Sequence, residues 1–239
     1  MKTKLPIRTV SMLVETMLLV FIVHFGHAQG TLRQHLGATD PVSEGFTLYT
    51  SPGGTVGPVT SDAGRDSWSV VSQGTPVGYV LSLTAAEQAS IGANDIVFSA
   101  AFRIVQSPNV WLGLYTPSQR FEFSFDSQLD GDPVVSTGFN PVFALEGGGP
   151  GYHDYQLFYH ATTEQVALWV DGVERVSDIT GTAGSSGWGG LWGAAQGTDS
   201  QANWNRVSFE IIPEPSSLAL LGCGGVLLCA CLLRRGRKR

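Results

Sequence analysis

The side chains best suited to acid–base chemistry lie in the segment 120–126, which reads RFEFSFD. Glu122, Ser124 and Asp126 alternate there with phenylalanines, so on a β-strand they would share one face. Hydrolysis of a glycosidic bond needs two carboxyl groups, about 5 to 5.5 Å apart in retaining enzymes and farther apart in inverting ones. We interpret these residues as the solvated face of a strand, because carboxylates are usually exposed.

Other groups suited to catalysis are sparse. His153 and His160 bracket a short segment, and their odd spacing would direct them to opposite faces of a strand. Asp171 and Glu174 flank a tight turn, which explains the aspartate without catalysis. The sequence has no nucleophile-elbow, zinc-protease or phosphate-loop motif. We therefore predict a protein that is not an enzyme, with a glycan-cleaving enzyme as the alternative.

Carboxylates also gather in the segment FDSQLDGDP, where Asp126, Asp130 and Asp132 lie within seven residues. Calcium favours such oxygen-rich loops, so these three residues form a candidate calcium site. Their spacing is not that of an EF-hand. Aspartate is also common in turns for local reasons, and plain turn residues are the alternative interpretation.

Aromatic rings concentrate in the Gly/Ser-rich stretch 180–205, which we expect to be a flexible loop. It holds half of the six tryptophans and two asparagines, and these form the candidate ligand-binding set Trp188, Trp192, Asn203, Trp204 and Asn205. Flat indole rings could stack on sugars while the amides bond hydroxyl groups. The alternative is that Trp192 and Trp204 close the end of a core, where aromatic rings bury much area. Trp111 and Trp169 alternate with apolar neighbours, so we expect them in the core.

Short segments with a period of two dominate from about residue 46 to residue 212, with Gly, Pro, Asn and Asp between them. Asp171-Gly172 predicts a hairpin turn, since glycine readily adopts a positive φ. Only 84–91 is typical of a helical turn, with Thr84 as N-cap and Glu87 completing a capping box. Strands of this kind without intervening helices predict one all-β domain, an antiparallel β-sandwich or jelly roll. The strands expected are 67–72, 78–83, 95–105, 110–115, 120–126, 155–159, 165–171, 173–179 and 205–212.

One stretch of about 60 residues, from YHDYQLFYHATTEQVALWVDGVERVSDITG to ANWNRVSFEI, resembles the laminin-G/concanavalin A-like group. The matching residues are Tyr155, Leu157, Tyr159, Leu168, Val170, Asp171, Gly172 and Val173. The resemblance implies a jelly roll and admits lectins, adhesion modules and glycoside hydrolases, so the fold leaves the function open. The hydrolases of this group carry a Glu-x-Asp-x-x-Glu motif, and the segment around Glu122 lacks its central acid and second glutamate.

Charge is distributed unevenly along the chain. Between residues 29 and 212 there are 6 arginines, no lysine and 18 acidic residues, a net charge of 6 − 18 = −12. An acidic surface repels phosphate backbones, which makes nucleic acid an unsuitable partner. All three cysteines lie in the apolar segment near the C-terminus, so the middle of the chain has no disulfide and no thiolate metal site.

The N-terminus carries Lys2, Lys4 and Arg8, then the apolar segment MLLVFIVHF and the small residues around Ala28. This order is typical of a secretory signal peptide cleaved after Ala28, and it predicts export across the inner membrane. We expect residues 29–45 to be a loose lead before the domain, and that lead would include His35.

The C-terminal stretch combines three features. Pro213, Glu214 and Pro215 precede 16 uncharged residues, 218–233. As a helix these 16 residues would extend about 24 Å. Their number is slightly below the about 17 to 25 residues that commonly span a bilayer. A basic tail follows, made up of Arg234, Arg235, Arg237, Lys238 and Arg239, and by the positive-inside rule it should stay in the cytoplasm. A simple membrane anchor is the alternative interpretation, although it leaves the Pro-Glu-Pro triplet unexplained.

These three features, in this order and spacing, resemble the PEP-CTERM sorting signal of Gram-negative bacteria. The resemblance implies recognition by an exosortase, cleavage near the triplet and delivery to the envelope or extracellular matrix. We thus expect a signal peptide (1–28), a lead (29–45), a β-sandwich (46–212) and a sorting signal with one transmembrane helix (213–239). The predicted function is an exported, lectin-like module that binds carbohydrate or exopolymer, with a glycoside hydrolase or a purely structural matrix protein as alternatives. No cofactor is expected apart from the candidate calcium.

Overall fold

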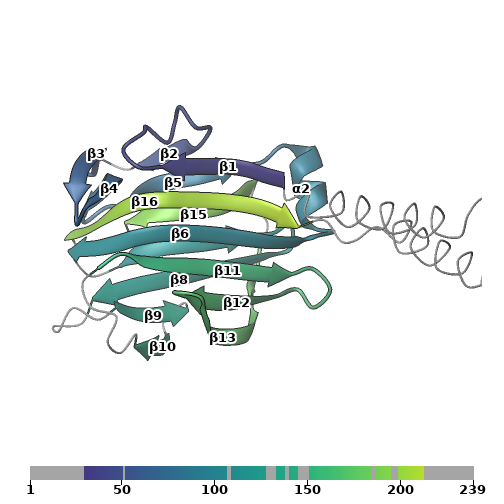
Figure 1. Cartoon of the computed structure of the whole chain (residues 1–239). Helices are drawn as coiled ribbons and strands as arrows, with labels where there is room; N and C mark the ends of the chain where they lie inside the picture. Colours follow the sequence, from purple (N-terminus) through teal and green to yellow (C-terminus); the bar gives the residue numbers. More distant parts are fainter. Residues whose placement is uncertain are drawn as a thin grey trace, which may run out of the picture.

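A computed structural model describes residues 30–50, 52–106, 109–127, 133–137, 140–144, 151–184, 187–194 and 199–212. Two antiparallel sheets of eight strands each stack face to face, as Figure 1 shows with β15 and β5 behind β16. The predicted β-sandwich is therefore confirmed. The two sheets are called sheet A and sheet B below.

Sheet A has the strand order β13-β12-β11-β6-β16-β4-β3, with β1 also paired to β16. Its strands are β1 (Gly30–Leu36), β3 (Thr55–Asp62), β4 (Arg65–Gln73), β6 (Asp95–Gln106), β11 (His153–His160), β12 (Gln165–Val170), β13 (Val173–Thr180) and β16 (Asp199–Ile212). The long strand β16 pairs with β6 along one edge and with β4 and then β1 along the other.

Sheet B has the order β10-β9-β8-β7-β15-β5-β2, with β14 also paired to β8. Its strands are β2 (Thr47–Thr50), β5 (Val77–Ser82), β7 (Val110–Tyr115), β8 (Gln119–Ser127), β9 (Pro133–Thr137), β10 (Asn140–Ala144), β14 (Thr182–Ala183) and β15 (Trp188–Ala194). Helix α2 (Ala85–Ile91) joins β5 of sheet B to β6 of sheet A.

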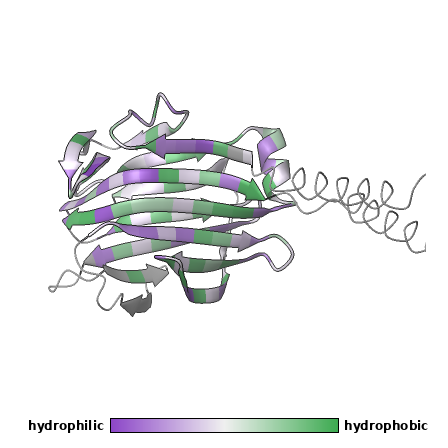
Figure 2. Ribbon diagram, viewed as in Figure 1, coloured by the Kyte–Doolittle hydropathy of each residue, from purple (hydrophilic) through white to green (hydrophobic). Residues whose placement is uncertain are grey.

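The period of two in the sequence decides which side chains fill the space between the sheets. On β8, Phe121, Phe123 and Phe125 are buried, whereas Glu122 is exposed. Figure 2 shows hydrophilic and hydrophobic residues interspersed along β11 and β16. One apolar core joins both sheets as a result.

Two local predictions are confirmed by the backbone. The turn between β12 and β13 has φ of 50° at Asp171 and 76° at Gly172, as a tight hairpin requires. Thr84 caps α2, and both halves of the capping box with Glu87 are present. The nine predicted strands are all found, and each lies within an observed strand or overruns its end by one residue.

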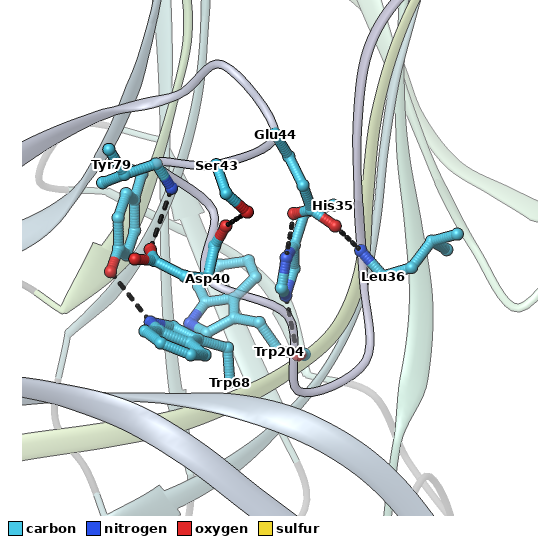
Figure 3. A network of polar contacts seen from close by, with 9 residues as sticks. His35, Leu36, Asp40, Ser43, Glu44, Trp68, Tyr79 and Trp204 are labelled. Atoms are coloured by element: carbon cyan, nitrogen blue, oxygen red, sulfur yellow. Dashed lines mark hydrogen bonds and ion pairs between the residues drawn. The ribbon is translucent and has the colours of Figure 1, made fainter.

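The segment expected to be a loose lead is instead partly a strand. Gly30–Leu36 pairs with β16 as β1, and the chain then crosses at residues 37–46 to β2 in the other sheet. His35 is fully buried, with Nδ1 2.6 Å from Glu44 Oε2 and Nε2 3.4 Å from the carbonyl oxygen of Trp204 (Figure 3). Its ring also stacks on Trp192, with centroids 5.3 Å apart. The N-terminal segment therefore closes one side of the sandwich, because its polar groups find partners inside it.

The glycine-rich stretch after residue 180 is also different from the flexible loop that was expected. Trp188–Ala194 forms β15 between β5 and β7, in the middle of sheet B. A Cβ at Gly190 would lie 2.9 Å from the ring of Phe98, and one at Gly193 would lie 2.3 Å from the carbonyl oxygen of Val77. These glycines allow close packing between the sheets and between neighbouring strands.

A half-buried acid, Asp62, fixes the tip of the β3–β4 hairpin to sheet A. Asp62 accepts hydrogen bonds from Arg103, from Tyr152 at 2.8 Å and from Asn203 at 2.8 Å. Burial alone would raise the pKa of Asp62, but these hydrogen bonds and the charge of Arg103 outweigh burial and lower it from 3.8. The ionised carboxylate therefore stabilises the fold.

We expect Asp62→Asn to lower the free energy of unfolding by about 1 to 3 kcal/mol at neutral pH, because Arg103 loses its charged partner. Since the folded pKa lies below the unfolded one, this stabilisation is complete above about pH 4 and disappears as the pH falls through the folded pKa. Urea titrations of both proteins from pH 7 to pH 2 measure the difference. A difference that stays constant down to pH 2 would contradict the assignment.

Candidate functional site

Partly exposed aromatic rings gather on the outer face of sheet B. Trp111 and Trp188 pack there against the buried side chains of Val80, Tyr115 and Leu191. Tyr49 on the edge strand β2 is 39% exposed and completes the group. We call Tyr49, Trp111, Tyr115 and Trp188 the aromatic face.

The rings of the aromatic face hold one another in place. Trp188 meets Tyr49 at 5.9 Å and Tyr115 at 5.7 Å between ring centroids, in both cases edge to face. Trp111 lies between two small cross-strand neighbours, Gly193 on β15 and Ser124 on β8. An indole beside small neighbours keeps part of its surface open to a ligand.

A carboxylate borders the aromatic face. The Tyr115 hydroxyl donates a 2.7 Å hydrogen bond to Oε1 of the exposed Glu122. The ring of Tyr115 passes over Gly113, where a Cβ would lie 3.1 Å from it. Burial, followed by the hydrogen bond to Glu122 and its negative charge, raises the pKa of Tyr115. The phenol of Tyr115 therefore stays protonated and holds one carboxylate oxygen of Glu122. The Glu122 side chain remains accessible to solvent.

A small cleft lies beside Glu122. Its volume is about 180 Å³, and its lining residues are Arg120, Glu122, Phe123, Ile179, Thr180, Gly181 and Thr182. It forms where the chain leaves β13 of sheet A and crosses to β14, which pairs with β8. The aromatic face, Glu122 and this cleft thus follow one another across sheet B.

Only one of the predicted ligand-binding residues lies on this face. Trp188 belongs to it, whereas Trp192 and Trp204 are fully buried between the sheets with their ring centroids 5.0 Å apart. Their core role, which was the alternative interpretation, is the one observed. Asn203 is buried against Asp62, and Nδ2 of Asn205 donates to the carbonyl oxygen of Asp66 at 2.7 Å.

The expectation that Trp111 and Trp169 lie in the core is wrong, because both are partly exposed. On β7 the inward positions belong to Val110, Leu112 and Leu114. The period of two therefore sends Trp111 outward together with Tyr115. Trp169 pairs with Gln156 and Glu174, and it lies directly between the inward-facing residues Leu168 and Val170, so it faces outward.

The histidines and acids proposed for chemistry are dispersed. His153 is buried, with Nδ1 2.7 Å from Oδ2 of Asp171, whereas His160 is exposed and lies 3.4 Å from Asp95. The two histidines therefore differ in environment, as their odd spacing predicted. Glu122, Ser124 and Asp126 share the outer face of β8, and Glu122 is solvated as interpreted.

Several predictions fall on residues that the structure does not describe. Asp130 and Asp132 of the candidate calcium site lie there, and only Asp126 is placed. Within the described ranges, no group of three or more histidine, cysteine or acidic side chains could hold a metal ion. The signal peptide, Pro213, Glu214, Pro215 and the basic tail also lie outside these ranges. No helix in the described part of the chain is long and apolar enough to cross a membrane.

The sequence matches no protein-family model and no curated protein sequence. Solved structures are similar to this chain at low sequence identity. A carbohydrate esterase of the Shiga toxin-encoding bacteriophage phi24B is 12% identical with a TM-score of 0.54, and the match covers 78% of this chain and all of the esterase chain. Domain 4 of AbnA, a GH43 extracellular arabinanase from Geobacillus stearothermophilus in complex with arabinotriose, is 12% identical with a TM-score of 0.48, over 78% of this chain and 96% of that one. The likeness to the phage esterase concerns the fold alone, and it is consistent with the predicted jelly roll.

Proposed function

We propose that this protein is an exported envelope or matrix module that binds carbohydrate on the aromatic face of sheet B. The observation that carries the proposal is the pair Trp111 and Trp188, two partly exposed indoles beside the accessible carboxylate of Glu122. The solved structure that shares the fold with a TM-score of 0.54 is that of a carbohydrate esterase, which supports a glycan as the ligand class.

The chemistry of the face suits a sugar. The apolar face of an indole can cover the C–H side of a pyranose or furanose ring, and burial of that apolar surface is favourable. Glu122 can accept hydrogen bonds from sugar hydroxyls, since Tyr115 occupies only one of its acceptor sites. Ring stacking would thus provide affinity, and the carboxylate would orient the bound sugar.

Export and sorting remain proposals that rest on the two ends of the sequence. A signal peptide would direct the β-sandwich across the inner membrane, while the basic tail stays in the cytoplasm. The PEP-CTERM-like segment would hold the protein there until an exosortase acts near Pro213-Glu214-Pro215. The acidic β-sandwich would then reach the envelope or the extracellular matrix. Calcium bound by Asp126, Asp130 and Asp132 also remains a proposal.

One observation favours the enzymatic alternative. Glu122 lines a cleft beside Arg120, and a carboxylate in a cleft is a common feature of glycoside hydrolases. A hydrolase would require a second carboxylate about 5 to 9.5 Å from Glu122. Asp126 shares its strand face but lies four residues along the strand, about 13 Å away by the strand rise.

The test uses the full-length protein in mild detergent on an array of poly- and oligosaccharides, together with an assay for released reducing sugar. We expect saturable binding to at least one glycan, unaffected by Trp169→Ala on the opposite sheet, and no sugar release. Binding to no glycan at all would support the purely structural alternative. Sugar release that is abolished by Glu122→Gln would establish the hydrolase instead.

A further inference from the structure

The distribution of charge on sheet B identifies which glycans its aromatic face can accept. Resting on the proposed function, we infer that this face binds neutral glycan chains laid across the strands, and that it excludes acidic polysaccharides.

Four neighbouring strands of sheet B carry no acidic or basic side chain. These strands are β7, β15, β5 and β2, with the sequences VWLGLY, WGGLWGA, VGYVLS and TLYT. Tyrosine is their only titratable residue, and the phenol of Tyr115 remains protonated because burial and Glu122 raise its pKa. The floor beneath a bound glycan is therefore electrically neutral.

The charges that border this floor are mostly negative. Strand β8 contributes Arg120, Glu122 and Asp126 to the outer face, a local balance of one cation against two anions. Arg120 is the one arginine on a described strand of sheet B, since Arg33, Arg65, Arg103, Arg175 and Arg206 all lie on strands of sheet A. Among the side chains of these described strands, a carboxylated or sulfated sugar on the aromatic face could pair only with Arg120, and the negative charge of Glu122 lies next to that arginine on the same strand.

The rest of the molecule adds to this repulsion. The net charge of −12 over residues 29–212 creates a negative potential around the domain, which lowers the local concentration of polyanions. This long-range effect is screened by salt, with a Debye length of about 10 Å at 0.1 M ionic strength. Exclusion of acidic polymers should thus weaken as salt rises, whereas binding of neutral chains should not change.

The rings and the carboxylate follow a path across the strands. Contacts lead from Tyr49 on β2 to Trp188 on β15, then to Tyr115 on β7 and Glu122 on β8, where the cleft begins. From β2 to β8 there are four inter-strand spacings of about 4.8 Å, or about 19 Å in all. Such a path suits several consecutive sugar units better than one terminal sugar, so affinity should rise with chain length.

The experiment compares polymers that share a backbone and differ in charge. Full-length protein is titrated with hydroxyethyl cellulose against carboxymethyl cellulose, and with polygalacturonate against its carboxyl-reduced form, at 20 mM and 500 mM NaCl. We expect the neutral member of a pair to bind at least 10-fold more tightly at 20 mM salt. The difference in affinity between the neutral and the acidic member should become smaller at 500 mM salt, and also in the double variant Glu122→Gln, Asp126→Asn. Trp169→Ala serves as the control that leaves the face intact.

The outcomes separate this inference from the proposed function. Equal or tighter binding of the acidic member at low salt, still lost in Trp188→Ala, would overturn the inference and leave glycan binding standing. If affinity does not rise from a disaccharide to a hexasaccharide of the bound neutral polymer, the glycan chain does not lie across the strands of sheet B, and that part of the inference is wrong. If neither member of any pair binds, and the glycan array is also negative, both the inference and the proposed function are wrong.

Discussion

Replacing Trp192 with alanine should lower the free energy of unfolding by about 3 to 5 kcal/mol, the range measured when large aromatic residues are removed from cores. Trp192 is fully buried and contacts four rings, those of His35, Phe46, Tyr79 and Trp204, at centroid distances from 4.7 to 5.8 Å. Its removal would leave a cavity between the two sheets. Urea unfolding followed by far-UV circular dichroism measures the loss.

Two further variants keep this prediction testable if the alanine protein does not fold. Trp192→Phe should lower the free energy of unfolding much less, because a phenyl ring retains stacking with Tyr79. The substitution also breaks no hydrogen bond of the indole N–H, which has no partner among the described residues. Trp169→Ala, at a partly exposed position on the outer face of sheet A, should lower the free energy of unfolding less than either Trp192 variant does. A Trp192→Ala protein as stable as Trp169→Ala would show that Trp192 is not a core residue.

The second large effect concerns binding. The double variant Trp111→Ala, Trp188→Ala should weaken glycan affinity by about 30-fold or more, since aromatic residues at the centre of an interface commonly contribute about 2 kcal/mol. Both rings lie on the outer face, so the sandwich should remain folded and lose less stability than it does in Trp192→Ala. Isothermal titration with the best glycan from the array, alongside a thermal melt, measures both quantities.

Single variants measure how much each residue of the aromatic face contributes to glycan affinity. Trp188→Ala also removes the ring contacts to Tyr49 and Tyr115, so it should cost more affinity than Tyr49→Phe, which keeps the ring. Tyr115→Phe should leave the stacking surface intact and remove the hydrogen bond that holds Glu122. Full affinity in the double tryptophan variant would place any glycan site elsewhere on the molecule.

The sandwich could be predicted because strands such as β8 and β11 follow a period of two. In β8 the phenylalanines fill the core and the polar residues lie on the opposite face, as the segment 120–126 indicated. The hairpin at Asp171-Gly172 and the capping box of Thr84 and Glu87 were also readable, since both depend on local chemistry. These features involve only neighbours in the sequence, so a sequence can reveal them.

Strands β1 and β15 were missed because their stability depends on distant partners. His35 makes the N-terminal segment look polar, yet the ring is satisfied by Glu44 and by the backbone of Trp204 on β16. In β15, glycine suggested a flexible loop. The glycines are instead required by Phe98 and Val77, which approach too closely for a Cβ. Neither requirement is visible without knowing which strands pair.

The site was only partly predictable. Trp188 and Glu122 were both identified from the sequence, but as separate candidates in a loop and on a strand face. Tyr115 and Trp111 complete the site because β7 lies between β15 and β8 in the sheet, an order that the chain sequence does not reveal. The alternation of Trp111 with Leu112 and Leu114 was the signal that could have placed it outside the core.

Fluorine NMR of full-length protein labelled with 5-fluorotryptophan tests the central claim most directly. The six tryptophans give six resonances, which can be assigned by single Trp→Phe substitutions. Titration with a binding glycan should shift the Trp111 and Trp188 signals and leave those of the buried Trp192 and Trp204 unchanged. A titration that shifts Trp169 alone, with Trp111 and Trp188 unmoved, would contradict glycan binding on sheet B.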